Sequence, residues 1–345
     1  MISRVLDSEP IPSLADYLEQ GGGRGLDAAH RLGAEATVEE VLASGLRGRG
    51  GAGFPTGRKW ATVARYRSEV LASTVVVNAS EGEPGSFKDR TLLRRNPFKV
   101  LEGALIAAWA VGADGVIVAV KKSFDQEVDR LRAAIKEVAA AGWCEETTIS
   151  VLEGPSEYLY GEETALLEVV NGRPPFPRLA PPYRHGVDEF GSDSAAPSEV
   201  TRATPGGHTA APPALVNNAE TMANVPGILA DGRTWYRSLG TSDSPGTLLC
   251  TVSGYTQRSG VGEFPMGTSL AEVIEILGGG PAGERIVAVL SGVANPILPA
   301  SLLGVELTYE AMEAAGGGLG AAGFIVFDET VDLLAVTHGV SRFLA

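Results

Sequence analysis

The stretch Gly45–Trp60, GLRGRGGAGFPTGRKW, combines the residue types needed to bind an anionic ligand. Six of its first thirteen residues are glycine, and its cationic side chains are Arg47, Arg49, Arg58 and Lys59. Glycines let the backbone adopt positive φ and approach a ligand closely, and their successive amides form concave nests that favour anions. The stretch therefore predicts a binding site for a phosphate-bearing cofactor.

Two familiar phosphate-binding motifs do not account for this glycine loop. Gly48, Gly50 and Gly53 match G-x-G-x-x-G, but that fingerprint must follow a strand. The preceding segment, Thr37–Ser44, has apolar residues at helical spacing and Thr37 in a capping position. The sequence contains no P-loop motif, G-x-x-x-x-G-K-[ST]. A flexible linker is the other alternative, although glycine-rich linkers usually carry serine rather than arginine and phenylalanine.

Three further polar segments could form the other walls of such a site. Asn78–Arg90, NASEGEPGSFKDR, follows an apolar, β-branched run, and its carboxylates Glu81 and Glu83 are opposite in charge to the glycine loop. Tyr158–Thr164, YLYGEET, and Asn217–Thr221, NNAET, each lie at an expected helix start. The structural alternatives for these segments are a solvated acidic turn, complementarity to a helix dipole, and capping alone.

Alternating strands and helices are expected to position these segments. Such alternation predicts a parallel sheet covered by helices, and ligands bind such sheets at the carboxyl ends of the strands. Expected strands cover residues 70–78, 115–120, 148–152, 247–253, 286–291 and 324–328. Expected helices cover residues 37–44, 59–67, 97–111, 125–141, 161–170, 216–229, 269–277 and a segment from 330, and a long loop covers 171–213. From residue 246 onwards, hairpin-like elements around one helix favour a β-grasp module.

In this order, the four segments resemble the flavoprotein subunit of respiratory complex I and the related subunits of NAD-linked hydrogenases and formate dehydrogenases. The family motifs concerned are the whole glycine loop, N-A-D-E-x-E-P-G-[ST]-[FY]-K-D-R, Y-x-C-G-E-E-T and V-N-N-V-E-T. The resemblance implies an α/β fold with an N-terminal arm at 1–36 and a Rossmann-like, parallel-sheet FMN- and NADH-binding domain at 37–240. A small β-grasp (SLBB-like) domain at 245–322 and the start of a C-terminal helical region at 323–345 are implied to follow.

The same resemblance implies FMN and NAD as cofactors and NADH dehydrogenase activity. Hydride would pass directly from nicotinamide to flavin, so no catalytic acid–base pair is needed. The residues implied to contact FMN are Gly48, Arg49, Gly50, Lys59, Asn78, Ser80, Glu81, Tyr158, Gly161, Glu162, Glu163, Asn217, Asn218 and Thr221. Those implied to contact NADH are Phe54, Glu83 and Tyr183.

Four positions depart from the family pattern, and one of them is Tyr183, which stands where the family usually has phenylalanine. Ser80 stands where the family has aspartate, Tyr160 replaces a cysteine, and Thr62 lies near the place of a third adenine-clamping aromatic residue. The lost charge at Ser80 is expected to raise the potential of the flavin. The incomplete aromatic clamp leaves the preference for NADH or NADPH open.

The electron path beyond the flavin is expected to need a partner. The family continues past a segment like VSRFLA into a C-x-x-C-x-x-C motif that holds a [4Fe–4S] cluster, whereas this sequence ends at Ala345. Its two cysteines, Cys144 and Cys250, are too few for an iron–sulfur or structural zinc site. We therefore expect no metal site here and an iron–sulfur partner subunit. Whether the sequence is a fragment or a natural short form, and which final acceptor is used, stay open.

Bulk properties exclude several other functions. The formal net charge of −14 over 345 residues disfavours nonspecific binding to nucleic acid, because phosphates would be repelled. The N-terminus lacks the apolar core of a signal peptide, and a glycine turn at 112–115 interrupts the most apolar stretch, Gly103–Val120. We expect a cytoplasmic location without direct membrane insertion, with a peripheral position on a membrane complex as an option. A non-catalytic paralogue that binds a ligand or docks a partner is the alternative function, and the oligomeric state is open.

Overall fold

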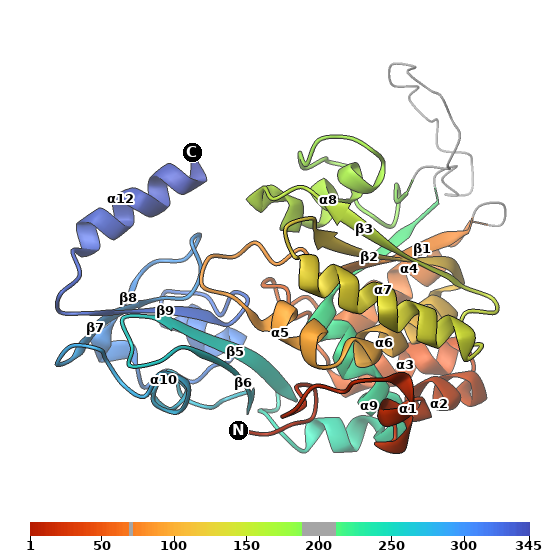
Figure 1. Ribbon diagram of the computed structural model, residues 1–345, viewed down its shortest axis with the longest axis horizontal. Coiled ribbons are helices and arrows are strands. Elements are labelled where there is room, and N and C mark those ends of the chain that lie inside the picture. The colour runs from red at the N-terminus through yellow and green to blue at the C-terminus, as the bar shows by residue number, and fades with distance from the viewer. Residues whose placement is uncertain (69–71, 188–211) are drawn as a thin grey trace.

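The protein is built around two sheets in separate parts of the chain. The computed structural model describes residues 1–68, 72–187 and 212–345. A four-stranded sheet has the order β3-β2-β1-β4, and a five-stranded sheet has the order β6-β5-β9-β7-β8. Figure 1 shows the second sheet beside the helix-rich first domain, with the N-terminus near their junction. The expected α/β class, with a parallel sheet first and a smaller β module second, is confirmed.

The first sheet is parallel throughout and brings the polar segments to one edge. Its strands are β1 (Ser73–Asn78), β2 (Ala113–Lys121), β3 (Thr148–Gly154) and β4 (Ala214–Asn218). The register pairs Asn78, the last residue of β1, with Asn218, the last residue of β4. Val75, Val76 and Val77 are fully buried, as expected for a central strand covered on both faces. The segments that follow β1 and β4 therefore start side by side.

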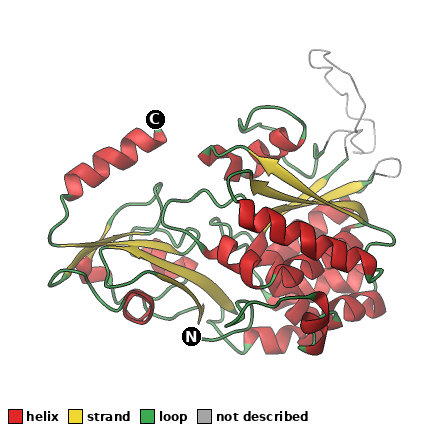
Figure 2. Ribbon diagram, in the orientation of Figure 1, coloured by secondary structure: helices red, strands yellow, loops and turns green. Residues whose placement is uncertain are grey.

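Helices cover both faces of this sheet (Figure 2). The main core lies on one face and contains α6 (Pro97–Val111), α7 (Asp125–Ala140) and α9 (Ala219–Arg237). The other face packs against α8 (Glu163–Val170) and the short 3-10 helix η1 (Tyr158–Gly161). The remaining helices of this part are α1 (Leu14–Glu19), α2 (Arg24–Leu32), α3 (Ala34–Ser44), α4 (Thr56–Arg65) and α5 (Lys88–Arg95).

The second sheet has the β-grasp arrangement that the sequence favours. Its first strand, β5, and its last, β9, pair in parallel at the centre, while β6 and β7 pair antiparallel on either side. Its elements are β5 (Thr247–Gly254), β6 (Gly260–Pro265), α10 (Leu270–Gly278), β7 (Ile286–Leu290), β8 (Leu298–Pro299), the 3-10 helix η2 (Ala300–Leu302), α11 (Tyr309–Ala314), β9 (Gly323–Asp328) and α12 (Leu333–Leu344). The domain boundary expected at residue 322 therefore falls inside this sheet.

Several local expectations need correction. Thr37 is not a helix cap, because α3 begins at Ala34 and the buried Thr37 hydroxyl donates to the carbonyl of Gly33 at 2.9 Å. The helix expected from Val216 is wrong in its start: residues 216–218 belong to β4, and α9 begins at Ala219. The N-terminal arm at 1–36, for which no helix is predicted from the sequence, contains α1. The long loop expected at 171–213 falls partly outside the described residues.

The N-terminal arm ties the two parts of the molecule together. The carboxylate of Glu263 in β6 accepts the amides of Val5 and Leu6 at 2.8 and 2.9 Å, and Asp7 pairs with Lys99 in α6 at 2.9 Å. As expected, α6 ends at Val111 and a left-handed Gly112 leads into β2. Within the described ranges no helix is both long and apolar enough to cross a membrane.

Candidate functional site

The glycine loop connects α3 to α4, and its two ends are joined by hydrogen bonds at a narrow neck. Its neck is held by backbone hydrogen bonds of 2.9 Å from Gly48 to the carbonyl of Phe54 and from Thr56 to the carbonyl of Leu46. The Nε atom of Arg47 donates to the carbonyl of Gly53 at 2.8 Å across the same neck. Gly53 has φ of +62°, in the left-handed region that favours glycine. The tip of the loop is thereby presented as a compact turn.

The tip of this loop offers free hydrogen-bond donors. Among the described residues, the backbone amides of residues 50–53 have no acceptor. The amide just before them, that of Arg49, donates to the hydroxyl of Thr221 at 2.8 Å. Consecutive free amides form a nest that suits a phosphate group. The anion-binding property expected from the glycines is therefore available in the backbone.

The loop tip meets the carboxyl ends of β1 and β4 at a cleft of about 290 Å³. This volume is at the lower end of small-molecule sites, which span roughly 300–1,000 Å³. The expected site residues that line the cleft are Gly50, Asn78, Ser80, Glu81, Glu83, Tyr158, Gly161, Glu162 and Asn218. The cleft is also lined by Gly82, Ser86, Asp89, Leu159 and Ala321, which sequence reasoning did not single out. Ser86 and Asp89 lie inside the motif Asn78–Arg90, so its spacing could have indicated them.

One wall of the cleft is a short hydrogen-bonded unit. The side-chain nitrogen Nδ2 of Asn78 donates to the carbonyl of Gly161 at 2.8 Å. Its side-chain oxygen accepts the hydroxyl of Ser80 at 2.6 Å. The strand-end segment and the segment that opens α8 are thus joined directly. Ser80, which replaces the family's aspartate, is fully buried and serves this contact.

The carboxylate of Glu81 is occupied by hydrogen bonds within the protein. Its carboxylate accepts the hydroxyl of Ser86 at 2.9 Å, the amide of Asp89 at 3.1 Å and the Nε of Arg90 at 3.1 Å. Its side chain is only 2% exposed. These bonds fix the turn that leads into α5, so Glu81 shapes the cleft by holding its loop.

A buried charge cluster lies at the base of the cleft. The ammonium of Lys88 is 2.8 Å from Asp89 and 2.8 Å from Glu220, and Asn218 donates to Asp89 at 2.7 Å. Burial opposes the charge on Lys88, but the two carboxylates raise its pKa above its ordinary value. Burial raises the pKa of Asp89 to about 6, although Lys88 opposes that rise. The cluster contains one cation for two acids, so Asp89 is the group that can take up a proton.

Other expected site residues lie behind or beside the cleft. Lys59 pairs with Glu163 at 2.8 Å, and Asn217 accepts the indole N–H of Trp60 at 2.9 Å. The guanidinium of Arg49 points into the domain junction, where it contacts the hydroxyl of Tyr236 at 3.0 Å. These side chains hold the elements of the site in place.

The two aromatic residues expected at the nucleotide lie in different places. Phe54, at the neck of the glycine loop, is 52% exposed. Tyr183 packs against Tyr66 with ring centroids 5.1 Å apart, next to the amino-terminal end of β4, since Pro182 accepts the amide of Ala214. The cleft lies at the carboxyl end of that strand. The structure therefore does not bring Tyr183 to the cleft.

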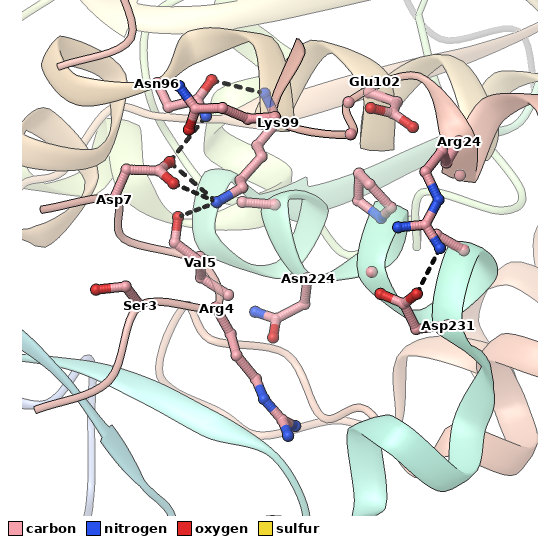
Figure 3. Close-up of a pocket in the computed structure, with 18 of the residues that line it drawn as sticks. Ser3, Arg4, Val5, Asp7, Arg24, Asn96, Lys99, Glu102, Asn224 and Asp231 are labelled. Atoms are coloured by element: carbon pink, nitrogen blue, oxygen red, sulfur yellow. Dashed lines mark hydrogen bonds and ion pairs between the residues drawn. The ribbon is translucent and has the colours of Figure 1, made fainter. Parts of the chain in front are cut away.

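A second cavity, about 370 Å³, lies between the N-terminal arm and α9. Figure 3 shows two ion pairs among its charged groups, Arg24 with Asp231 at 2.6 Å and Lys99 with Asp7 at 2.9 Å. Its buried Glu102 accepts the hydroxyl of Tyr17 at 2.6 Å and two backbone amides. None of the expected site residues lines this cavity, whereas nine of them line the cleft at the sheet edge, so the cleft is the better candidate.

The cleft fits a flavin mononucleotide by its donor set. The free amides suit the phosphate, and the Asn78–Ser80 and Asn218 side chains offer amide and hydroxyl groups at the strand ends. In the described part of the chain, no group of three or more His, Cys, Asp or Glu side chains is arranged to hold a metal ion.

Comparison with known proteins gives a consistent assignment. A family model described as the Nuo51 FMN-binding domain matches residues 41–227. An NADH-quinone oxidoreductase subunit of Rickettsia felis is 36% identical over 322 residues, which are 90% of this chain and 71% of that protein. An NADH-quinone oxidoreductase subunit of Rhizobium meliloti is 35% identical over 341 residues, 96% of this chain and 76% of that protein.

A solved structure supports the same assignment. A chain of the NAD⁺-reducing [NiFe]-hydrogenase in the H2-reduced state superposes with a TM-score of 0.79 at 34% identity, over 97% of this chain. This chain spans about half, 54%, of the length of that hydrogenase chain. The chain therefore belongs to the Nuo51 FMN-binding family of FMN-dependent NADH dehydrogenase subunits, which confirms the resemblance carried by the glycine loop and the three polar segments.

Proposed function

We propose that this chain is the FMN-dependent, NADH-oxidising subunit of a larger electron-transfer assembly. The observation that carries this proposal is the cleft at the carboxyl ends of β1 and β4, where the free amides of the glycine loop begin. Cofactors of parallel-sheet folds bind at this edge. When bound, FMN would supply a two-electron carrier that takes hydride from NADH and releases electrons singly.

The chain's own residues would bind and orient the two nucleotides. In this proposal the amides of residues 50–53 hold the FMN phosphate, and the wall formed by Asn78, Ser80 and Gly161 sets the width of the cleft. Phe54 is exposed on the same loop and would stack on the adenine of NADH. Thr221 acts indirectly, by holding the amide of Arg49.

Electrons would leave through a partner subunit that carries iron–sulfur clusters. The two cysteines of the sequence cannot ligate such a cluster, and both relatives described above are named as subunits. We propose that the assembly works in the cytoplasm, peripheral to any membrane component.

A non-catalytic paralogue is the second candidate function. It is favoured by the carboxylate of Glu83, which would have to serve NADH but already accepts the hydroxyl of Tyr158 and the amide of Val293, each at 2.7 Å. In this alternative the chain binds flavin or docks a partner without turning over NADH.

Flavin analysis and anaerobic reduction separate the two candidates. The purified chain should show flavin absorbance, release FMN rather than FAD on denaturation at about one equivalent, and lose its absorbance near 450 nm on addition of NADH. Bound FMN that NADH does not reduce would support the paralogue. Failure to bind FMN when apoprotein is reconstituted would refute the NADH-oxidising subunit and leave the paralogue only a docking role.

A further inference from the structure

The side chain of Tyr309, from the second domain, packs against the glycine loop. Tyr309 is the first residue of α11, and its hydroxyl donates to the carbonyl of Gly48 at 2.8 Å. The same hydroxyl accepts a hydrogen bond from Arg49 at 3.3 Å. The guanidinium carbon of Arg47 lies 4.0 Å from the centre of the Tyr309 ring, within the range of a cation–π contact. Three consecutive residues of the loop thus contact one side chain that lies 261 positions from Gly48 in the sequence.

The loop is shaped to accept this ring. A Cβ atom added to Gly53 would lie 2.4 Å from the Tyr309 ring, which is closer than non-bonded atoms can approach. The residue next to Tyr309 adds a second anchor, because Glu310 pairs with Arg47 and accepts the hydroxyl of Ser244 at 2.7 Å. Gly53 is therefore explained by the close approach of the second domain as well as by its positive φ.

The contact fixes one peptide unit from both sides. The carbonyl of Gly48 and the amide of Arg49 belong to the same planar peptide group. Tyr309 holds its oxygen and Thr221 in α9 holds its N–H, each at 2.8 Å. The next amide along the chain is that of Gly50, the first of the free donors at the tip. Only the two backbone dihedrals of Arg49 separate this peptide plane from the Gly50 amide, so holding the plane restricts where that amide can point.

We propose that Tyr309 is a positioning residue for the cofactor loop: it orients the Gly48–Arg49 peptide so that the amides of residues 50–53 face the ligand. This inference deepens the proposed function and rests on it for the identity of the ligand. The second domain is then part of the cofactor site, because it supplies one of the two clamps on the loop.

The decisive variant is Tyr309→Phe, which keeps the ring under Arg47 and removes only the hydroxyl. Loss of the hydroxyl that bonds Gly48 and Arg49 is expected to raise the Kd of apoprotein for FMN roughly tenfold. It should also speed hydrogen exchange at the Arg49 amide, which is hydrogen-bonded to Thr221. Tyr309→Ala should have a larger effect of the same kind. Tyr255→Phe is the matched control, since Tyr255 is an exposed tyrosine of the same domain without a side-chain hydrogen bond in the described structure.

Thr221→Val tests the other side of the peptide clamp. If both residues orient one peptide, either substitution alone already frees the peptide plane. The fold-increase in Kd of the double variant Thr221→Val with Tyr309→Phe should then be smaller than the product of the fold-increases of the two single variants. Multiplicative effects in the double variant would contradict a shared clamp. A thermal midpoint of Tyr309→Phe near that of wild type would separate positioning from general loss of structure.

Hydrogen exchange in the flavin-free protein keeps this test independent of the proposed function. Unchanged exchange at the hydrogen-bonded Arg49 amide in Tyr309→Phe, or a Kd equal to that of wild type, would overturn the role of Tyr309. Failure of the wild-type protein itself to bind FMN would refute the proposed function, while the exchange measurement would still decide whether Tyr309 orients the loop.

Discussion

The hydroxyl of Tyr158 donates a hydrogen bond of 2.7 Å to the carboxylate of Glu83, which joins two sequence segments that lie 75 residues apart. Burial raises the pKa of Tyr158, and the hydrogen bond to Glu83 raises it further. The other oxygen of Glu83 accepts the amide of Val293 at 2.7 Å, just after β7 of the second sheet. Glu83, which lines the cleft, is therefore held by contacts from both domains.

Replacing Gly50 with valine should abolish retention of FMN while the fold survives. A Cβ at this position would lie 3.3 Å from the Cβ of Asn218, and the valine methyl groups would extend into the cleft that Gly50 lines. Flavin content by absorbance and far-UV circular dichroism are the measurements. Gly304→Val is the matched control, because a Cβ there meets nothing within 4 Å. Undiminished flavin in Gly50→Val would refute the assignment of the loop.

Phe54→Ala should raise the KM for NADH and leave FMN bound. Aromatic stacking is worth on the order of 1 kcal/mol, which corresponds to roughly a fivefold change in KM. Tyr183→Ala distinguishes the sequence-based expectation from the structure: its ring packs on Tyr66 away from the cleft, so the KM should stay near the wild-type value. Steady-state kinetics with an artificial acceptor would measure both. Loss of FMN in Phe54→Ala with an unchanged KM would show that the roles are reversed.

Asp89→Asn should change how the stability of the protein depends on pH. The pKa of Asp89 is raised from 3.8 to about 6, so the folded state favours its protonated form. The protonated carboxyl of Asp89 stabilises the folded state fully at pH values below its ordinary pKa of 3.8. This stabilisation is lost as the pH rises through about 6, and linkage puts the loss at roughly 2–3 kcal/mol in the free energy of unfolding. Asparagine stays neutral and lacks this loss. Relative to wild type, the variant should therefore gain stability as the pH rises from about 4 to above 6.

Urea unfolding at several pH values in that range would measure this difference. The exposed Asp27→Asn provides a change of the same chemical type outside the buried cluster. A stability difference between Asp89→Asn and wild type that stays constant with pH would contradict the raised pKa.

The isolated chain should reduce small acceptors such as ferricyanide with NADH, but not a one-electron protein acceptor. The reason is that two cysteines cannot ligate an iron–sulfur cluster to carry single electrons onward. Iron analysis and low-temperature EPR of the NADH-reduced protein would test this. A stoichiometric iron–sulfur signal would overturn the expectation, as would rapid reduction of a protein acceptor without a partner subunit.

The local features of the site could be predicted from the sequence because they depend on neighbouring residues. Glycines 51 and 53 adopt the positive φ that the glycine-rich loop suggests. Asn96 caps α6 and Pro97 opens it, as their order predicts. The β-branched run in β1 is buried on both faces, and the polar segment after it lies at the carboxyl edge of a parallel sheet. Backbone preferences and hydrophobic patterning determine such features at short range.

The directions of the long side chains were decided only by the tertiary structure. Arg47 and Arg49 have the charge expected for a phosphate site, yet they turn toward Glu310 and Tyr236. Tyr183 fits an aromatic clamp by its position in the sequence but packs at the opposite edge of the sheet. The contact of Tyr309 with the glycine loop has no local signal, since its partner is 261 residues away. A flexible charged or aromatic side chain takes the partner that the folded chain brings within reach, and that partner is set by the packing of the two domains.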